Sequence, residues 1–420
     1  MKYLSGRLLL KKNLSSEELK IGHSELAGMI EVPDGKIRCQ RCGSLHDKAG
    51  SRLPIGAYYC RTCIELGRVR SDEWLCNFPQ ADYPRQSYLV WQGELSLEQE
   101  DCSRQLKSLV LMPGKTWLHA VTGAGKTEMI YPAIDQVLQQ GRTVALASPR
   151  VDVLIELHKR LSRDFSCEIP ILYAESKDYF ASPLVIASTH QLLRFREAFD
   201  LLIIDEVDAF PFVENPIFGE VLELARKADS HLLYMTATSH PSLELEVKQD
   251  DLYKIQLSRR FHGFPLVLPQ LFWLSRFGKA YQRQRSSSFP LLIFVPDFKT
   301  GEDLAQKLGE VFVSSETPDR HELVEDFRSG KISVLISTTI LERGVTFPKL
   351  DVFVYRADHF HFTAPVLVQI AGRVGRSRER PTGELCFFHK GKTLAMIRAT
   401  AEIKGHNRGA FPKGGAKDEI

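Results

Sequence analysis

The stretch A-V-T-G-A-G-K-T-E at residues 120–128 decides the fold class of this chain. An apolar, β-type run at residues 116–121 leads into it, and a pattern with helical spacing follows at residues 127–140. A strand, a glycine-rich turn and a helix N-terminus in this order form an anion site, because the backbone N–H groups and the helix dipole point at the same place. The stretch therefore predicts a phosphate-binding loop. A glycine-rich turn that merely carries a lysine is the alternative.

The residue types of this loop each have a physical role in nucleotide binding. Gly123 and Gly125 let the chain turn so tightly that its N–H groups reach phosphate oxygens. Lys126 is placed to contact the β- and γ-phosphates, and Thr127 to bind Mg²⁺. The predicted ATP-binding residues of the loop are Thr122, Gly123, Ala124, Gly125, Lys126, Thr127 and Glu128.

The length and the charge distribution limit the classes of protein to consider. A chain of 420 residues is too long for one hydrophobic core and suits two or three domains. Residues 36–70 carry eight Lys or Arg against two acids, and residues 371–420 carry eleven against five, although the net charge is only +3. Two basic regions around an acidic centre favour a polyanionic partner, with a solvated charged surface as the alternative. No apolar run is long enough for a membrane helix, so we expect a cytoplasmic protein.

Two C-x-x-C pairs, separated by seventeen residues, lie in the first basic region. Each pair offers two sulfurs to one tetrahedral ion, and a metal is needed to fold so small a module, at about residues 36–70. The predicted zinc ligands are Cys39, Cys42, Cys60 and Cys63. A redox dithiol is disfavoured, because neither pair lies beside a thioredoxin-like strand and helix. His46 is a candidate to replace one sulfur, but we expect it to be a spare loop histidine. The basic and aromatic residues around the ligands suit single-stranded nucleic acid or a protein surface.

From about residue 95 onward, the chain alternates continuously apolar β-type runs with helical patterns. This alternation predicts parallel sheets covered by helices on both faces. A basic and aromatic stretch at residues 259–264 separates two sets of runs, and we expect a hinge there. The expected strands are residues 116–121, 144–147, 184–188, 201–204 and 232–235 in the first set, and 291–295, 311–314, 334–337, 352–355 and 384–388 in the second. We predict an α/β protein with an N-terminal region at 1–94, two parallel-sheet domains at 95–256 and 257–403, and a mobile basic tail at 404–420.

The acidic group D-E-V-D at residues 205–208 directly follows the apolar run 201–204. Acids at the carboxyl end of a buried parallel strand face the crevice in which such sheets bind ligands. Asp205 is therefore predicted to share Mg²⁺ with Thr127, and Glu206 to polarise the attacking water. A simple acidic turn is the alternative, which the phosphate-binding loop in the same domain argues against.

The second domain contains the group Q-I-A-G-R-V-G-R at residues 369–376. Gln369, Arg373 and Arg376 are four and three residues apart, and this spacing predicts that they share one helix face. An arginine that faces the γ-phosphate from a second domain typically contributes about 10³ to 10⁵ in rate. The predicted catalytic residues are Lys126, Asp205, Glu206, Gln369, Arg373 and Arg376. A solvated basic helix is the alternative for the last two.

The motifs, taken in order, resemble those of a superfamily-two helicase motor of the DEAD/DEAH type with two RecA-like lobes. The set is T-G-A-G-K-T, A-S-P-R at 147–150, S-T-H-Q at 188–191, D-E-V-D, T-A-T at 236–238, the segment 338–346 and Q-I-A-G-R-V-G-R. Together with the four-cysteine module in front of the motor, the chain resembles the ComFA family of bacterial late-competence ATPases. It resembles the primosomal restart helicases more distantly.

The resemblance implies that ATP, with Mg²⁺, binds between the lobes and that a nucleic acid crosses both of them. It places Gln99 on the adenine; Gln99 also stands at a capping-box distance from Ser96. The residues that it places along the nucleic acid are Pro149, Arg150, Thr189, His190 and Thr338. Most of these contacts would be to phosphates, which position a strand without reading its sequence.

The resemblance further implies a motor that moves along, or pulls, single-stranded DNA during DNA uptake in natural transformation. The short distance between residues 346 and 369 leaves little room for a strand-separating hairpin and disfavours strong unwinding. The implied partners are single-stranded DNA, a membrane channel, a phosphoribosyltransferase-like competence protein and other uptake proteins. The implied location is the inner face of the cell membrane. The residues leave open whether the chain forms a homo-oligomer.

Other functions stay open on the sequence alone. A replication-restart or repair DNA helicase is one, for which we would expect modules beyond the zinc site. An RNA helicase is disfavoured by the D-E-V-D group and by the zinc module. A nucleic-acid-binding zinc scaffold with a regulatory ATPase is a different class, and the presence of Lys126, Glu206 and Arg376 argues against an inactive motor.

Overall fold

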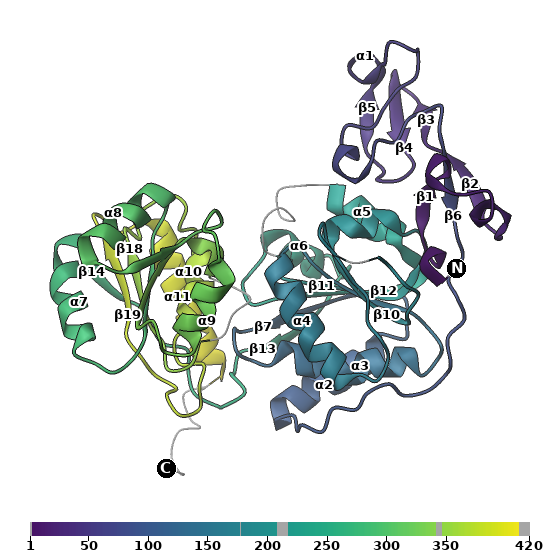
Figure 1. Cartoon of the computed structure of the whole chain (residues 1–420). Coiled ribbons are helices and arrows are strands. Elements are labelled where there is room, and N and C mark those ends of the chain that lie inside the picture. Colours follow the sequence, from purple (N-terminus) through teal and green to yellow (C-terminus); the bar gives the residue numbers. More distant parts are fainter. Residues whose placement is uncertain (1, 177, 208–216, 342–346, 411–420) are drawn as a thin grey trace.

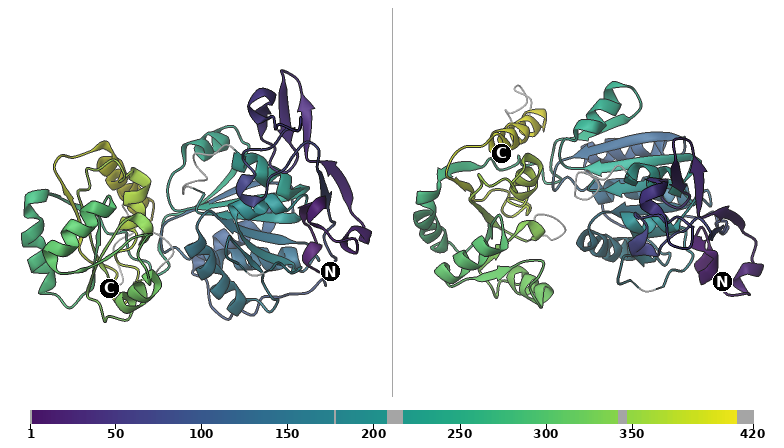
Figure 2. Two further views of the ribbon diagram at one scale, coloured as in Figure 1. Left: turned by 45° about the horizontal axis from the view of Figure 1, so that its top comes forward. Right: turned by 90° about the horizontal axis from the view of Figure 1, so that it is seen from above.

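A computed structural model of the chain describes residues 2–176, 178–207, 217–341 and 347–410 (Figure 1). Two helix-covered parallel sheets form two lobes, and a small N-terminal domain with a four-cysteine cluster lies against the first lobe. Figure 2 shows the same arrangement from two further directions. The predicted fold class, an α/β protein with two parallel-sheet lobes after a small four-cysteine domain, is confirmed.

The first lobe is built on a seven-stranded sheet in the order β13-β7-β12-β11-β8-β10-β9, with every pair parallel. Its strands are β7 (Gly114–Ala120), β8 (Val144–Ser148), β9 (Ile171–Leu172), β10 (Leu184–Ser188), β11 (Phe199–Asp205), β12 (Arg226–Thr236) and β13 (Tyr253–Leu257). Its helices are α2 (Leu97–Leu109), α3 (Lys126–Leu138), α4 (Val151–Asp164), the short 3-10 helix η5 (Thr189–Arg194), α5 (Ile217–Ala225) and α6 (Pro241–Lys248). Every residue of β8 and β11 is buried, as expected for strands covered on both faces.

The second lobe is built on a six-stranded parallel sheet in the order β14-β19-β18-β15-β17-β16. Its strands are β14 (Gln270–Trp273), β15 (Leu291–Phe294), β16 (Val311–Val313), β17 (Val334–Ser337), β18 (Asp351–Tyr355) and β19 (Leu385–His389). Its helices are η6 (Leu274–Arg276), α7 (Phe277–Arg285), α8 (Phe298–Leu308), α9 (Arg320–Arg328), η7 (Thr339–Leu341), α10 (Ala364–Ala371) and α11 (Leu394–Ala410). None of the described helices combines the length and the apolarity that a membrane span requires.

The N-terminal domain consists of two small antiparallel sheets. One has the order β1-β6-β2, and the other, next to the cysteines, has the order β3-β4-β5. The strands are β1 (Leu8–Leu10), β2 (Ser24–Ala27), β3 (Met29–Val32), β4 (Lys36–Cys39), β5 (Leu45–Asp47) and β6 (Trp74–Asn77), with short helices η1 (Lys2–Leu4), η2 (Lys11–Asn13), η3 (Glu18–Lys20), α1 (Lys48–Ser51) and η4 (Ile64–Leu66). Arg196 of the first lobe donates to the carbonyl of Gln40 at 3.0 Å, so the cysteine module is held to the motor by a specific contact.

Helix α11 packs on α10 and also reaches the first lobe. The backbone N–H of Ser239 donates to the Glu402 carboxylate at 3.0 Å. The Asn407 side chain makes two hydrogen bonds, of 2.8 and 2.9 Å, to the backbone of Leu266 in the connection between the lobes. The prediction of a mobile tail from residue 404 is wrong for residues 404–410, because burial of Ile403 and His406 continues the helix to Ala410. Residues 411–420 lie outside the described part.

Candidate active site

The phosphate-binding loop lies where the sequence predicts it, between the end of β7 and the start of α3 at Lys126. Gly123 and Gly125 both have left-handed backbones, with φ of +82° and +74°. A Cβ on Gly125 would lie 2.4 Å from Nε2 of Gln99, so a side chain here would displace the Gln99 amide. The Lys126 ammonium donates to the carbonyl of Ala120 at 3.0 Å. The left-handed backbone thus favours glycine at both positions.

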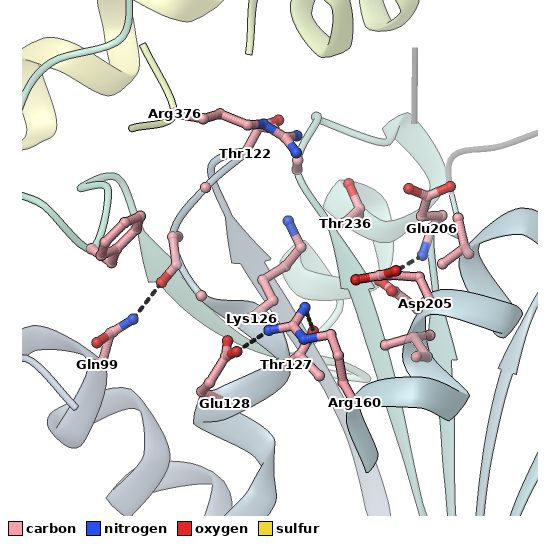
Figure 3. Close-up of a pocket in the computed structure, with 18 of the residues that line it drawn as sticks. Gln99, Thr122, Lys126, Thr127, Glu128, Arg160, Asp205, Glu206, Thr236 and Arg376 are labelled. Carbon is pink, nitrogen blue, oxygen red and sulfur yellow. Dashed lines mark hydrogen bonds and ion pairs between the residues drawn. The ribbon is translucent and has the colours of Figure 1, made fainter. Parts of the chain in front are cut away.

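A cavity of about 450 Å³ opens above this loop, between the two lobes (Figure 3). Of the predicted ATP-binding and catalytic residues, Gln99, Thr122, Gly123, Ala124, Gly125, Lys126, Thr127, Glu128, Asp205, Glu206, Gln369 and Arg376 line it. Arg373 does not belong to the lining. The cavity therefore brings together groups from four separate parts of the sequence.

Gln99 lies at the beginning of α2 with both ends of its amide engaged. Its Oε1 accepts from the Ser96 backbone N–H at 2.8 Å, which completes a capping box. Its Nε2 donates to the carbonyl of Ala124 at 2.8 Å. The side chain thus ties the start of α2 to the phosphate-binding loop, and its role on adenine stays a prediction.

Two oxygen groups from neighbouring elements face the same cavity and suit Mg²⁺. Thr127 is the second residue of α3, and Asp205 is the last residue of β11. Hydroxyl and carboxylate oxygens are the ligands that Mg²⁺ prefers, together with phosphate oxygens of the nucleotide. Glu206 follows with a left-handed backbone, φ +56°, and its N–H donates to Oδ1 of Asp205 at 3.0 Å. Asp208, the last residue of the acidic group, lies outside the described residues.

Arg160 on α4 is a lining residue that the sequence analysis missed. It donates to the Thr127 hydroxyl at 3.4 Å and forms an ion pair with Glu128. Burial lowers the pKa of its guanidinium, with a further contribution from Arg163. No motif marks this arginine, because its partners lie 32 and 33 residues away and are met only after folding. It fixes the first turn of α3, beside the predicted Mg²⁺ ligands.

The second lobe meets the phosphate-binding loop through the segment after α10. The Thr122 hydroxyl donates to Oε1 of Gln369 at 3.3 Å. A Cβ on Gly372 would lie 2.6 Å from the Cβ of Thr122, so only glycine permits this approach. The prediction that Gln369, Arg373 and Arg376 share one helix face is wrong. Helix α10 ends at Ala371, and both arginines follow in a turn.

The two predicted arginines, which follow the end of α10, lie in different environments. Arg376 lines the cavity, and its Nε donates to the carbonyl of Gly372 at 3.2 Å. Its pKa is lowered to about 10 by burial, which Glu206 across the cavity partly opposes. Arg373 is only 1% exposed and is packed inside the lobe. Of the two, only Arg376 is placed to meet a nucleotide.

Arg260, in the connection between the lobes, organises this turn and was not singled out by the sequence analysis. Its guanidinium is 2% exposed and donates to three carbonyls, those of Val374 at 2.8 Å, Gly375 at 2.7 Å and Gly372 at 3.2 Å. Burial, and then the nearby Arg376, lowers its pKa to about 9. Arg260 is thus a positioning residue for the arginine turn.

Replacing Arg260 by methionine is expected to lower kcat for ATP hydrolysis by about 10²-fold with little change in KM, because Arg376 loses its fixed position while the loop stays intact. Steady-state kinetics and a thermal unfolding curve measure both effects. Arg259→Met is the matched control, since Arg259 is partly exposed and pairs with Glu98 at 2.7 Å. A rise in KM alone, or an equal effect of both variants, would rule out this positioning role.

The four predicted zinc ligands meet in the N-terminal domain. Their sulfurs lie within 4.8 Å of one another, and all four side chains are buried. The measured pairs are Cys39 with Cys63 at 3.9 Å and Cys42 with Cys60 at 3.5 Å. Four thiols around one point fit a tetrahedral Zn²⁺ site. The guanidinium of Arg41 donates to the sulfur of Cys63 at 3.4 Å, a contact that favours the thiolate form.

Cys39→Ser is expected to remove the zinc and to unfold residues 36–70, since the metal stabilises such a small module. Zinc content and limited proteolysis of this segment measure the two effects. Cys167→Ser, at a cysteine outside the cluster, is the control. His46→Ala should retain the metal, although the ring lies 3.2 Å from the sulfur of Cys60. One zinc per chain in Cys39→Ser, with the segment still resistant to proteolysis, would contradict the expectation that Cys39 is needed to hold the metal.

The predicted nucleic-acid residues follow the carboxyl ends of parallel strands in both lobes. Pro149 and Arg150 come after β8, Thr189 and His190 after β10, and Thr338 after β17. His190 is exposed, whereas Thr189 is fully buried, so the Thr189 hydroxyl is not accessible to a strand in this structure. Its position in the first turn of η5, where the chain packs into the lobe, is the reason. Residues 342–346 of the segment 338–346 lie outside the described part.

The T-A-T group ends β12 beside the cavity. Thr236 and Ala237 line the cavity, and the Thr236 hydroxyl donates to the carbonyl of Thr238 at 2.5 Å. The Thr238 N–H returns a hydrogen bond to the Thr236 hydroxyl at 2.8 Å. The group is therefore a closed local turn next to the acids of β11.

Comparisons with known proteins agree with this architecture. Residues 1–77 match the competence protein ComFA N-terminal domain, residues 92–240 the type III restriction enzyme res subunit, and residues 280–378 the helicase conserved C-terminal domain. The chain is 48% identical to competence protein ComFA of Streptococcus pneumoniae (strain ATCC BAA-255 / R6), over 96% of this chain and 98% of that protein. The chain belongs to the ComFA family. Competence protein ComFA of Bacillus subtilis (strain 168) is 35% identical over 96% of this chain and 94% of its own length.

The motor of this ComFA family member has the fold of superfamily-two helicases. It is similar to the solved structure of S. cerevisiae Dbp5 bound to RNA and ADP BeF3, with a TM-score of 0.56 and 15% identity, over 74% of this chain and 91% of that chain. At this identity the similarity shows the fold alone, and it confirms the two RecA-like lobes. The helicase-type ATPase domains support an ATP-hydrolysing enzyme, with ATP and Mg²⁺ as the molecules that such a fold binds.

Proposed function

We propose that this ComFA family member is an ATP-driven motor that moves along single-stranded DNA and serves DNA uptake in natural transformation. The observation that carries the proposal is the cavity between the lobes. It combines a phosphate-binding loop and two acids from the first lobe with Gln369 and Arg376 from the second. A site divided between two lobes hydrolyses ATP only when the lobes come together, and this requirement couples chemistry to motion.

The residues of the cavity divide the work of hydrolysis. Backbone N–H groups of the loop and Lys126 bind the phosphates, while Thr127 and Asp205 would hold Mg²⁺, which would supply positive charge beside the phosphates. Glu206 orients the attacking water and accepts its proton. Arg376 stabilises the charge that develops on the transferred phosphoryl group. Glu206 and Arg376 both line the cavity, one from each lobe, which supports a role for each on the same nucleotide.

The residues expected to contact DNA lie on the same connecting segments as residues expected to bind the nucleotide. Hydrolysis can therefore change how tightly the motor binds DNA. Pro149 and Arg150 lead directly into α4, whose Arg160 contacts Thr127. Across the lobes, Arg320 on α9 lies 3.5 Å from Asp152, which also lies 3.5 Å from Arg150. Opening or closing the cleft therefore changes the surroundings of Arg150. This arrangement supports a stepwise shift of the strand during each ATP cycle.

Translocation is favoured over strong unwinding by the connection between β18 and α10. The segment 356–363 between these two elements contains turns and no strand pair, so this described part offers no hairpin to separate two strands. The strand contacts expected at Arg150, His190 and Thr338 meet the phosphate backbone, which suits movement along DNA of any sequence.

The cellular setting is a proposal that follows from the family. As a competence motor, the chain would act with a membrane channel, a phosphoribosyltransferase-like competence protein and other uptake proteins, at the inner face of the cell membrane. The zinc module would supply a contact surface for DNA or for one of these partners. A homo-oligomer is a further arrangement that the same experiments can detect.

Steady-state ATP hydrolysis by the zinc-loaded protein tests the proposal, measured alone and with single-stranded DNA, duplex DNA, branched DNA or RNA. We expect stimulation of at least tenfold, chiefly by single-stranded DNA, because a motor turns over productively on its own track. Stimulation chiefly by RNA or by branched duplex would overturn the proposal in favour of an RNA helicase or a repair helicase. Absence of turnover with every nucleic acid would favour a scaffold.

A further inference from the structure

A second cavity, of about 570 Å³, lies where the N-terminal domain meets the first lobe. Tyr3 and Arg7 line it from the N-terminal domain, Tyr173 from the segment after β9, and Gln191 and Arg194 from η5. The Tyr179 hydroxyl donates to the carbonyl of Ser5 at 3.0 Å and holds the two walls together. The cavity is separate from the ATP site, and no residue lines both.

Among the described residues, no carboxylate forms an ion pair with the two guanidinium groups in this cavity, those of Arg7 and Arg194. Arg7 is 7% exposed and lies over the rings of Tyr179 and Phe195, at 4.9 and 5.4 Å. Within the described part of the chain, Nε of Arg7 and Nε of Arg194 have no hydrogen-bond partner. Burial, and then the neighbouring Arg194, lowers the pKa of Arg7 to about 10, which Tyr179 only partly opposes. Asp178 also lines the cavity but is exposed and forms no ion pair with either arginine in the described structure.

Two like charges that share one partly buried cavity repel each other, and an anion bound between them would relieve this repulsion. Guanidinium groups bind phosphate through paired, charge-assisted hydrogen bonds, and both arginines line the cavity. The tyrosines add aromatic rings on which a nucleobase can stack. The chemistry of the cavity thus fits a phosphate that carries an aromatic base.

The position of the cavity relates it to the expected DNA path. Strands β8, β10 and β9 are neighbours in the sheet, in this order. Arg150 follows the carboxyl end of β8, His190 follows that of β10, and Tyr173 follows that of β9. Arg194 stands on the same short helix as His190. The cavity is therefore the next position along the edge at which parallel sheets bind ligands.

We infer that this cavity binds the backbone of single-stranded DNA, with Arg7 and Arg194 on one phosphate and a neighbouring base against Tyr173 or Tyr3. The strand path then continues from the motor onto the N-terminal domain. This inference rests on the proposed function, since it extends the same strand. It assigns to the N-terminal domain a DNA contact that lies outside the zinc module.

The test compares the binding of labelled oligo-dT of two lengths, about 8 and about 16 nucleotides, within the range of site sizes known for single-strand grooves. Arg194→Gln is expected to weaken binding of the longer strand about tenfold and to reduce the slope of log K against log salt by about 0.7, the value for one phosphate contact. Binding of the shorter strand and ATP hydrolysis without DNA should stay as in the wild type.

Arg7→Lys is the second variant, because it keeps the charge and the buried stem while removing the fork that meets a phosphate. It is expected to weaken binding of the longer strand by about two- to fivefold, given the lost paired geometry. Arg104→Gln, at a largely exposed position on α2, is the matched control and should bind as the wild type. A thermal unfolding curve of each variant verifies its fold.

Equal binding of the longer strand by Arg194→Gln and wild type would overturn the inference while leaving the proposed motor intact. Absence of single-stranded DNA binding by the wild type would overturn both. A third result is a thermal stabilisation by inorganic phosphate or dTMP that Arg194→Gln abolishes, with unchanged oligo-dT binding. It would assign the cavity to a free phosphate compound and also overturn the inference.

Discussion

Lys126→Ala is expected to lower kcat for ATP hydrolysis by about 10²- to 10³-fold, the usual cost of removing one charged or hydrogen-bonding group from a transition state. The ammonium belongs to the lining of the ATP cavity and donates to Ala120 within the phosphate-binding loop, at 3.0 Å. The affinity for single-stranded DNA should change by less than about twofold, because the residues expected to contact DNA follow β-strands other than β7. Paired ATPase and fluorescence anisotropy measurements provide both values.

Lys115→Ala is the matched control for this experiment. Lys115 stands near the start of the same strand, β7, and its ammonium lies 3.7 Å from Glu223 and 4.0 Å from Glu246, away from the cavity. Its loss should leave hydrolysis near the wild-type value. Turnover retained by Lys126→Ala would refute the assignment of the ATP site, and DNA binding lost together with turnover would point to misfolding.

Arg376→Ala is expected to have the largest effect, a fall in kcat of about 10³- to 10⁵-fold, as for other arginines that act from a second domain. Nucleotide binding should weaken far less, because the phosphate-binding loop lies entirely in the first lobe. Arg376→Lys should recover little activity, since an ammonium lacks the planar fork. Single-turnover hydrolysis and equilibrium binding of a fluorescent ATP analogue separate the two effects.

The neighbouring Arg378 offers a close control for Arg376. It lies two residues further along the same segment and is exposed. Arg378→Ala should therefore retain turnover, and a loss equal to that of Arg376→Ala would mean that the segment acts through its net charge. Arg373→Ala answers a different question. Its side chain is buried away from the cavity lining, so we expect lower stability more than a specific loss of kcat.

The motor could be predicted from sequence because its central strands are continuously apolar. Residues 201–204 and 334–337, for example, lie within or coincide with the buried strands β11 and β17. Strand β9 has two residues and β13 is partly exposed at the edge of the sheet, so neither produces such a run. Strands β2 and β5 of the N-terminal domain are short and lack buried residues, so their apolar pattern is weak.

Some residues of the candidate site can be recognised from their neighbours in the sequence, whereas others depend on contacts that form only after folding. The loop at 122–128 and the acids after β11 are encoded within a few neighbouring residues, and spacing reveals them. Arg260 donates to backbone carbonyls 112 to 115 residues away. Every residue has such a carbonyl, so the sequence does not show which ones Arg260 contacts. The helical spacing of Arg373 and Arg376 misled because Gly372 and Gly375 follow α10. The left-handed φ of Gly375, +68°, is incompatible with continuing that helix.

Helix α11 contacts both sides of the joint between the lobes. Its Glu402 holds Ser239 of the first lobe, while its Asn407 holds the connecting segment at Leu266. A hydrogen bond to a neutral group contributes about 0.5–1.5 kcal/mol net, and one to a charged group such as the Glu402 carboxylate about 1.5–3 kcal/mol. Helix α11 thus links the first lobe to the connecting segment, and a relative motion of the lobes must change these contacts. A probe or a surface anchor attached at the C-terminal side of α11 would therefore act on a helix that contacts both sides of the joint. It would alter the relative motion of the lobes that it is meant to report.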